Sequence, residues 1–372
     1  MAKLGDIATY INGYAFKPQD WSDEGIPIIR IQDLTGNSYQ ANRYNGEYAS
    51  KYEVNDGDVL ISWSASLGVY IWHGEKAVLN QHIFKVVFDK KRISKDFFVH
   101  QVGLILENAA SDAHGATMKH LTKPIFDALP FYLPPYEKQC EIAEVLDKVT
   151  SLISLRKQQL AKLDELVKAR FVEMFGDPVN NPMNYPKSQL GKVCDVRDGT
   201  HDSPEYYDVG YPLVTSKNVT GGKIDLSECN LISEDDYKKI CERSKVDRGD
   251  IIMPMIGTVG KPVIVNAEPT FAIKNVALIK FTPDSLVTNI YIKTLLESDY
   301  FDRAVLDKIR GGTQKFIALG DIRKLEIILP DFKHQQCFST FVERVDRQKQ
   351  TIQQSLEKLE LMKKALMQEY FG

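Results

Sequence analysis

The sequence lacks any apolar stretch of about 18 residues, the length that a membrane-spanning helix requires. Its first ten residues also lack the basic segment followed by an apolar one that marks a secretion signal. Low-complexity tracts and Gly/Ser-rich linkers are absent, and 43% hydrophobic with 26% charged residues are typical of a folded protein. We therefore expect a folded, cytoplasmic protein without a membrane segment.

Cysteine is scarce, and no two cysteines form a C-x-x-C pair. The five are Cys140, Cys194, Cys229, Cys241 and Cys337. The seven histidines likewise show no metal-ligand spacing. The sequence therefore predicts no metal site, no disulfide framework and no cofactor, and we interpret the cysteines as buried or incidental thiols.

An excess of positive charge is missing as well. The formal net charge is −3, with 13 basic and 15 acidic residues in 1–136 and 20 basic and 23 acidic residues in 177–332. Proteins that bind nucleic acid mainly through its phosphates are usually basic. If the ligand is DNA, we expect a local basic face or a partner that supplies phosphate contacts, and weak binding by this chain alone.

The most informative feature that is present is an internal repeat. Residues 129–176 align without a gap onto residues 325–372, at a constant offset of 196. Three shorter blocks repeat in the same order further toward the N-terminus, which makes chance similarity a poor explanation. These blocks pair residues 4–5 with 190–191, 25–29 with 210–214, and 57–61 with 249–253.

The repeat predicts an α+β protein with two similar mixed α/β domains, joined by two long antiparallel coiled-coil helices. The predicted ranges are 1–136 and 187–332 for the domains, 137–176 and 333–372 for the helices, and 177–186 for a Pro/Asn-rich joint. Apolar runs predict strands at Ile26–Ile31, Val59–Trp63, Ile83–Phe88, Ile251–Met255 and Val276–Phe281. Further helices are expected near Ser94–Asn108 and Thr288–Ile309.

Both long helices show heptad spacing of apolar residues and contain no Pro or Gly in their interiors. A helix of about 38 residues is about 57 Å long at 1.5 Å per residue. We expect the two apolar seams to pack against each other, and the alternative is two separate arms that bridge to other proteins. The predicted seam residues are Leu146, Ile153, Leu160, Leu163, Val167, Val345, Ile352, Leu356, Leu359 and Leu366.

Three groups of residues carry a resemblance to a known family. They are GDVLISW at 57–63 with GDII at 249–252, GAT at 115–117 with GTQKFI at 312–317, and LPPYEKQ at 133–139. In these segments, and over nearly its whole length, the chain resembles the specificity subunits of type I restriction-modification systems. It departs from the pattern at Asp331 and His334, which stand where the first copy has Pro135 and Lys138, and at Met118, which stands opposite Gln314.

The resemblance implies a DNA-recognition subunit without catalytic activity of its own. Each globular domain would be a target recognition domain that reads one half of a bipartite, asymmetric site on double-stranded DNA. The long helices would dock two methyltransferase subunits and set the spacer between the half-sites. Restriction translocase-nuclease subunits would join through the complex.

Two other classes of protein remain open. A stand-alone DNA methyltransferase is suggested by LPPY at 133–136, but this box needs an acceptor that can hydrogen-bond a flipped base, and Leu133 has none. The segment GTVGK at 257–261 is too short for a phosphate-binding loop, and Pro262 follows it. A coiled-coil adaptor that does not bind DNA is the second alternative, and it fits the excess of acidic over basic residues. A methyltransferase gene beside the gene for this chain would argue against it.

Arg, Lys, Asn and Gln side chains can match donors and acceptors on base edges, so the turns between aligned strands supply the candidate DNA contacts. The candidates pair across the two copies of the repeat. They are Arg30, Gln32, Lys119 and His120 in the first copy, and Lys217, Asn218, Lys261, Lys274, Asn275, Gln314 and Lys315 in the second.

Overall fold

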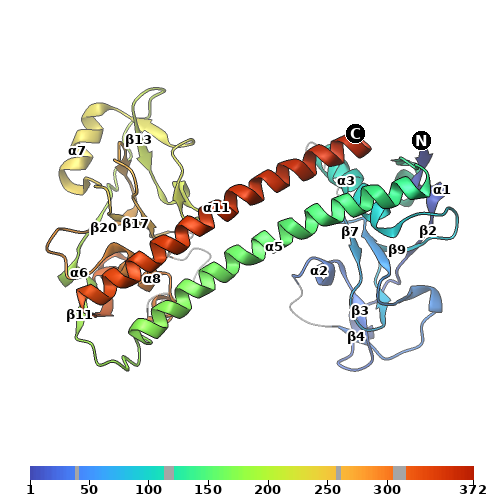
Figure 1. The fold of residues 1–372 in the computed structure, drawn as a ribbon, viewed down its shortest axis with the longest axis horizontal. Helices are drawn as coiled ribbons and strands as arrows, with labels where there is room; N and C mark the ends of the chain where they lie inside the picture. Colours follow the sequence, from blue (N-terminus) through green and yellow to red (C-terminus); the bar gives the residue numbers. More distant parts are fainter. Residues whose placement is uncertain (38–41, 113–120, 257–260, 305–315) are drawn as a thin grey trace. The chain divides into compact units, whose positions relative to one another are not determined.

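The computed structural model describes residues 1–37, 42–112, 121–256, 261–304 and 316–372. The chain divides into two compact units: unit 1 is Met1–Lys157 with Gln354–Gly372, and unit 2 is Gln158–Gln353. Each unit holds a globular part and one half of each of two long helices, α5 (Tyr136–Phe175) and α11 (Phe332–Phe371) (Figure 1). Both helices expected from the heptad pattern are therefore present, with 40 residues each.

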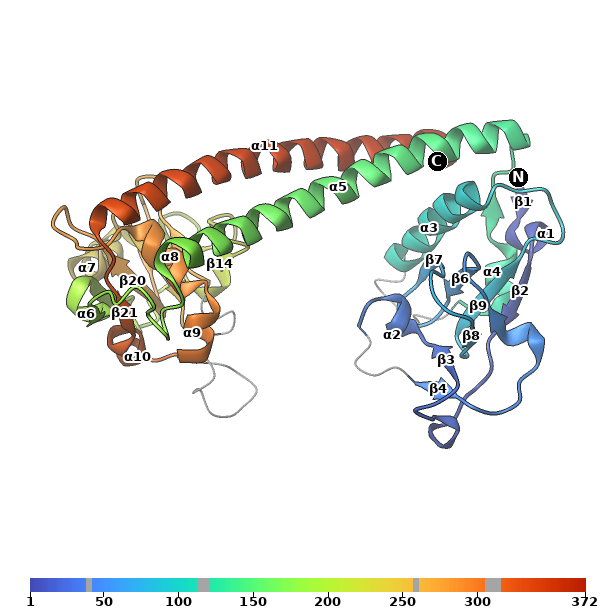
Figure 2. The same ribbon diagram turned by 60° about the horizontal axis from the view of Figure 1, so that its bottom comes forward.

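Unit 1 contains two four-stranded sheets. The first is antiparallel, in the order β2 (Thr9–Asn12), β9 (Ile83–Val87), β6 (Val59–Ser62) and β7 (Gly68–Ile71). The second has the order β4 (Arg43–Tyr44), β3 (Ile26–Ile29), β8 (Ala77–Leu79) and β5 (Glu53–Val54), and its β3–β8 pair is parallel. Helix α3 (Lys95–Asp112) packs against β7 (Figure 2).

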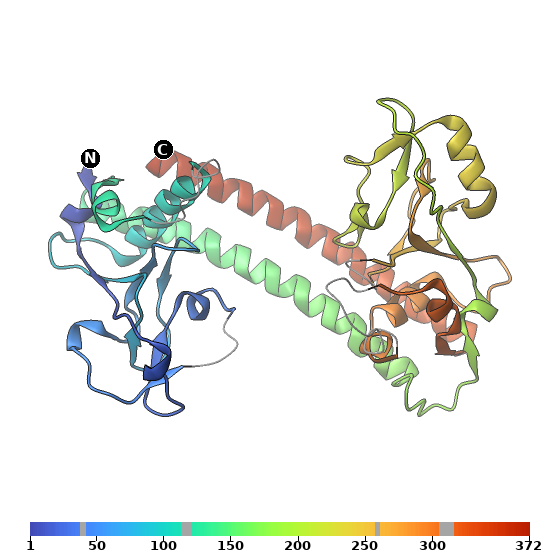
Figure 3. The same cartoon turned by 180° about the vertical axis from the view of Figure 1, so that it is seen from behind.

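Unit 2 repeats this arrangement. Its antiparallel sheet has the order β12 (Asp195–Asp198), β20 (Val276–Lys280), β17 (Ile251–Pro254) and β18 (Val263–Ile264). A second sheet consists of β16 (Asn230–Ile232), β13 (Tyr211–Val214) and β19 (Ala272–Ile273), and β13–β19 is parallel like β3–β8. Helix α7 (Glu234–Ser244), the yellow helix of Figure 3, packs beside β19. The repeat found in the sequence is thus a repeat of strand order.

Short elements complete each unit. Unit 1 adds β1 (Ala2–Lys3), β10 (Pro130–Phe131), α1 (Leu4–Ile7), α2 (Ile31–Leu34), α4 (Lys123–Ala128), η1 (Pro18–Asp20) and η2 (Ser50–Tyr52). Unit 2 adds β11 (Lys187–Gln189), β21 (Glu326–Ile328), β14 (Val219–Thr220), β15 (Lys223–Ile224), α6 (Leu190–Val193), α8 (Asn289–Leu296), α9 (Asp299–Ala304), α10 (Leu319–Lys324) and η3 (Ser216–Asn218). Strands β1 and β10 pair, as do β11 and β21.

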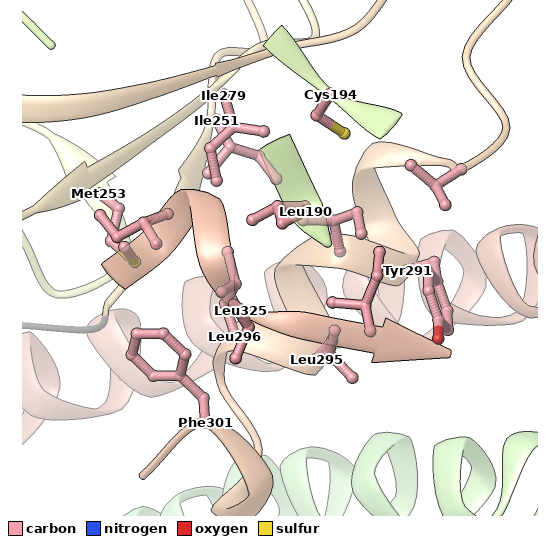
Figure 4. Close-up of a cluster of buried hydrophobic side chains, with 14 of the residues drawn as sticks. Leu190, Cys194, Ile251, Met253, Ile279, Tyr291, Leu295, Leu296, Phe301 and Leu325 are labelled. Carbon is pink, nitrogen blue, oxygen red and sulfur yellow. The ribbon is translucent and has the colours of Figure 1, made fainter. Parts of the chain in front are cut away.

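The core of each unit includes side chains from both long helices. In unit 2, Phe171 and Phe175 of α5 pack with Phe338 of α11 and with Tyr291 of α8. Figure 4 shows Tyr291 in this core, whose other labelled members are Leu190, Cys194, Ile251, Met253, Ile279, Leu295, Leu296, Phe301 and Leu325. Burying one such ring contributes about 1.5–3 kcal/mol, so each helix half is anchored to its unit by hydrophobic burial.

The core of unit 1 likewise includes side chains from the first turns of α5 and is covered by side chains from the last turns of α11. Ile142 and Leu146 belong to its buried core, and Leu366 and Phe371 pack against that core. The ring of Phe371 contacts the ring of Phe97 on α3, with 5.4 Å between centroids. A continuous helix from one repeat therefore begins in one core and ends in the other.

The structure corrects two of the expected elements. The strand expected at Ile26–Ile31 ends at Ile29, because the Asp33 side chain accepts a hydrogen bond from the Arg30 backbone N–H at 2.8 Å and starts α2. The helix expected at Thr288–Ile309 breaks between α8 and α9, where the Ser298 hydroxyl donates to the Leu295 carbonyl at 2.6 Å. Residues 305–309 lie outside the described part of the chain.

Candidate nucleic-acid interface

Both units contain the same close crossing of two chain segments, at the end of β2 in unit 1 and of β12 in unit 2. The Gly13 N–H donates to the Ile83 carbonyl at 3.1 Å, and the Gly199 N–H donates to the Val276 carbonyl at 3.0 Å. A Cβ on Gly13 would lie 2.0 Å from the Asn80 oxygen, and a Cβ on Gly199 would lie 2.4 Å from the Ile273 oxygen. Only glycine fits at these two positions.

Polar side chains surround each crossing. The next residue pairs in parallel with the residue that follows β8 or β19: Tyr14 with Asn80, and Thr200 with Lys274. We call the two places the strand crossings, defined by Gly13, Tyr14, Asn80, Gln81 and His82 in unit 1, and by Gly199, Thr200, His201, Lys274 and Asn275 in unit 2.

Each strand crossing includes a non-glycine residue in the left-handed backbone region. His82 has φ +71° and directly precedes β9, and Asn275 has φ +54° and directly precedes β20. This conformation costs roughly 1–2 kcal/mol for most residues and less for Asn, whose side chain can hydrogen-bond locally. Because such a cost persists only where the surrounding structure imposes it, both positions are candidates for a functional role.

In unit 2 the crossing carries a chain of hydrogen-bonded polar groups. The His201 ring contacts Asn275 Oδ1 through Nδ1 and Asp198 Oδ2 through Nε2, both at 2.8 Å. Asp198 is only 8% exposed, and its other oxygen pairs with Arg243. The hydrogen bonds to Asn275 and then to Asp198 raise the pKa of His201 above its usual value. An imidazolium that donates from both ring nitrogens satisfies both oxygens.

Beside these hydrogen-bonded groups, Lys274 contacts the loop of residues 200–203, which includes His201. Its Nζ donates to Ser203 Oγ at 2.6 Å. Lys274 and Asn275, two of the predicted candidates, thus both contact residues 200–203.

The crossing of unit 1 has a different chemistry on the same backbone. Asn12 Oδ1 accepts a hydrogen bond from Trp63 Nε1 at 3.1 Å, and the His82 ring contacts the Trp63 ring edge-on with 4.9 Å between centroids. Unit 1 therefore has the amide of Asn12 where unit 2 has the acid of Asp198, and the imidazole of His82 where unit 2 has the amide of Asn275. The two units share a scaffold but offer different donor and acceptor patterns.

The remaining candidates lie in several places. Arg30 pairs with Asp33 at 3.3 Å and lies over the Trp21 ring with Gln32 beside it, so its side chain is only 14% exposed. Lys217 and Lys261 are exposed. Asn218 is buried, and its Oδ1 accepts hydrogen bonds from the Thr215 backbone and hydroxyl. Four candidates lie outside the described residues: Lys119, His120, Gln314 and Lys315.

The predicted seam residues are buried or half-buried along both helices. Leu146, Val345 and Leu356 are buried, and the half-buried ones are Ile153, Leu160, Leu163, Val167, Ile352, Leu359 and Leu366. In unit 2, Arg170 lies over the Phe341 ring and Asp164 pairs with Lys349 at 2.5 Å, so the helices run antiparallel there. In unit 1, Lys157 pairs with Glu360 at 3.0 Å.

An outward apolar row on α5 was not predicted. Val145, Leu152 and Leu166 are 38–46% exposed and lie at multiples of seven residues. At this spacing the position between Leu152 and Leu166 is Gln159, so the continuous apolar part of the row is Val145 and Leu152 in unit 1.

Sequence reasoning also missed Asp198 and His201. The available signal was that Asn12-Gly13 and Asp198-Gly199 end equivalent strands, because a shared glycine with a polar neighbour on each side marks a close backbone approach. The partner segments 80–82 and 274–275 are far away in sequence, so their proximity could not be seen.

Within the described ranges, no cluster of three or more metal-ligating side chains and no helix suited to crossing a membrane is found. All five cysteines are free thiols. Burial raises the pKa of Cys194 to about 12, so this thiol stays protonated and unreactive near neutral pH.

Comparisons with known proteins cover nearly the whole chain. The family model described as "Type I restriction modification DNA specificity domain" matches residues 1–165 and 182–361. The chain is 23% identical over 366 residues to the type I restriction enzyme EcoBI specificity subunit of Escherichia coli, spanning 89% of this chain and 76% of that protein. It is 24% identical over 390 residues to the MjaVIII specificity subunit of Methanocaldococcus jannaschii, spanning 99% and 90%.

Solved structures have the same fold. The S subunit of a type I restriction-modification system from M. genitalium superposes with a TM-score of 0.55 at 13% identity, covering 100% of this chain and 95% of that one. A chain from a structure of complex assembly in a type I restriction-modification system superposes with a TM-score of 0.56 at 15% identity, covering 100% and 96%.

Proposed function

The chain belongs to the type I restriction modification DNA specificity family, and from this premise we propose that each of its two units reads one half of a bipartite, asymmetric DNA site. Its role in the restriction-modification complex is DNA sequence recognition. In this proposal, residues 1–136 and 187–332 are the two target recognition domains. The chain is not an enzyme itself, and it works in the cytoplasm, where its DNA lies.

The observation that carries this proposal is the pair of strand crossings. Both have the same backbone, with a required glycine and a left-handed residue, but Trp63 and His82 occupy one and His201 and Asn275 the other. Two readers of unlike half-sites need a common scaffold with unlike donor and acceptor groups. The exposed or partly exposed predicted candidates of unit 2, Lys217, Lys261, Lys274 and Asn275, are proposed to contact DNA, together with the candidates outside the described residues.

The net negative charge favours a role for other subunits in DNA binding. Neither globular range has an excess of basic residues, so phosphate contacts by this chain alone supply little affinity. We propose that two methyltransferase subunits bind along the helices and supply the remaining contacts with double-stranded DNA. Translocase-nuclease subunits then join this assembly. The exposed apolar residues Val145 and Leu152 of the outward row support helix-to-helix docking, because such side chains bury well against another amphipathic helix.

A domain exchange tests the division into half-site readers. Residues 1–135 are replaced by the corresponding segment of a relative with a different recognition sequence, and the hybrid is assembled with methyltransferase subunits. Sequencing of methylated sites should show one altered half-site, with the other half and the spacer unchanged. The reciprocal exchange of residues 187–332 is the matched control and should alter only the other half. Changes in both half-sites from a single exchange would contradict the proposal.

A further inference from the structure

We propose that Asn275 reads a base edge in the half-site of unit 2, and that His201 and Asp198 are positioning residues that decide which end of the Asn275 amide faces the DNA. This inference rests on the proposed function and goes beyond it by assigning one contact and its orienting groups. To recognise a base, an asparagine side chain needs a rigid backbone and a hydrogen-bonding atom that points to no group of its own chain. It also needs neighbouring groups that hold the amide in one orientation.

The backbone of Asn275 is held from two sides. Its N–H donates to the Thr200 carbonyl at 3.2 Å, and its carbonyl accepts from Ser216 Oγ at 3.3 Å. Asn275 has a left-handed φ of +54° and directly precedes β20. A side chain on such a pinned residue loses little further entropy when it binds, which is what specific recognition requires.

The His201 ring determines the orientation of the amide. Asp198 is buried, one of its oxygens pairs with Arg243, and the other accepts a hydrogen bond from Nε2 of His201. If Nδ1 also carries a proton, the Asn275 oxygen must face the ring, as it does at 2.8 Å. The amide NH2 then faces away from the ring and is available as a donor, because within the described chain no acceptor is assigned to it.

The chemistry of this face points to the class of base. Asn275 offers its NH2, and Lys274, which contacts the same loop through Ser203, offers an ammonium group. Both are donors, and guanine is the base whose major-groove edge presents two acceptors, O6 and N7. If His201 is neutral, Nδ1 becomes an acceptor and the amide must turn to donate to it. Its oxygen then faces the DNA and suits the amino groups of adenine or cytosine.

The charged groups that face His201 act in both directions on its protonation, and the balance favours the imidazolium. Asp198 on β12 favours the cation, whereas Arg243 on α7 opposes it, and Lys274 lies on the segment after β19. The pKa of His201 is raised, with the hydrogen bond to Asn275 as the largest cause. The donor face is therefore present below the raised pKa of His201 and is lost as the pH rises through it.

The test uses the full chain assembled with methyltransferase subunits and a DNA library randomised over both half-sites, with methylation read by sequencing. Asn275→Ala should weaken base preference by about five- to a hundredfold at one position of the unit 2 half-site, because one base contact is lost. Asn266→Ala, an exposed asparagine in the same unit, is the matched control and should leave all preferences intact.

The positioning role of His201 is tested by pH. In the wild-type complex, preference at that one position should shift from guanine toward adenine or cytosine as the pH is raised through the pKa of His201. His201→Asn should remove this pH dependence, and Asp198→Asn should move it to lower pH. His201 is 61% exposed, so its replacement leaves the fold intact even if the buried Asp198 does not tolerate change.

The outcomes separate this inference from the function on which it rests. A change confined to one position of one half-site supports it. An unchanged recognition sequence in Asn275→Ala, a uniform loss of methylation at every sequence, or a base preference independent of pH in the wild type would overturn it. Altered preferences in both half-sites would instead contradict the proposed division of the site between the two units.

Discussion

The side chain of Gln139, buried at the start of α5, accepts a hydrogen bond from the backbone N–H of Ser94 at 2.9 Å. Its Nε2 donates to the Pro134 carbonyl at 2.9 Å, so one amide joins the long helix to the start of α3. Gln335 does the same in unit 2, with Thr288 at 2.9 Å and Pro330 at 2.8 Å. Both glutamines fix the direction in which a long helix leaves its globular part.

Replacing Gln139 by Leu should lower the free energy of unfolding by about 1–3 kcal/mol, because the buried Ser94 N–H and Pro134 carbonyl lose their partner. Chemical denaturation followed by circular dichroism measures this change. Glu137→Gln, exposed two residues earlier, is the control and should have little effect. A Gln139→Leu protein as stable as the control would show that the amide bridge does not hold the helix.

Replacing Val167 by Asp should cost about 3 kcal/mol, because this seam residue packs against the core of unit 2 and a carboxylate there loses its hydration. Lys168→Asp places the same charge on the exposed neighbouring position and should cost much less. Thermal unfolding of the two variants decides the matter, and equal melting temperatures would mean that the seam at Val167 is not buried in the folded chain.

Replacing Leu152 by Glu should leave the chain as stable as before but weaken its binding to methyltransferase subunits tenfold or more. Leu152 is 43% exposed on the outward row, so it contributes little to the fold and is available to a partner helix. Ser154→Glu, on a different face of α5, serves as the control. Titration of labelled chain with methyltransferase measures both affinities, and equal affinities would exclude the row as a docking site.

Adding one heptad to each long helix, after Lys157 in α5 and after Gln353 in α11, should lengthen the spacer by about three base pairs. Seven residues add about 10 Å, and base pairs are about 3.4 Å apart. Both insertions fall at the boundary between the units and keep the seam in phase. An unchanged spacer in the methylated sites would show that the length of the helices does not set the distance between the half-sites. Inserting into one helix only is the matched control and should destabilise the chain.

In the proposed role as a DNA-recognition subunit, the isolated chain should neither methylate nor cut DNA, because methyl transfer and cleavage would come from the partner subunits. The assay supplies S-adenosylmethionine, Mg²⁺ and ATP to purified chain whose mass has been verified. Methyl transfer or cleavage by that preparation would require an enzymatic role.

The sequence alone determined the repeat, the strand runs and the two long helices, because each depends on residues close together in the chain. Heptad spacing, the gapless 196-residue offset and apolar runs such as 251–255 are local patterns that hydrophobic burial enforces. The family resemblance also depended on local segments. The break at Ser298 escaped prediction because a single side-chain hydrogen bond decides it.

Only the tertiary structure decided which segments meet. Phe171 and Phe175 end the first repeat but belong to the core of unit 2, because α5 passes from one unit to the other. His201 and Asn275 are 74 residues apart and touch only because Gly199 allows β12 and the segment after β19 to cross. Contacts of this kind depend on long-range strand pairing, which no spacing of residue types encodes.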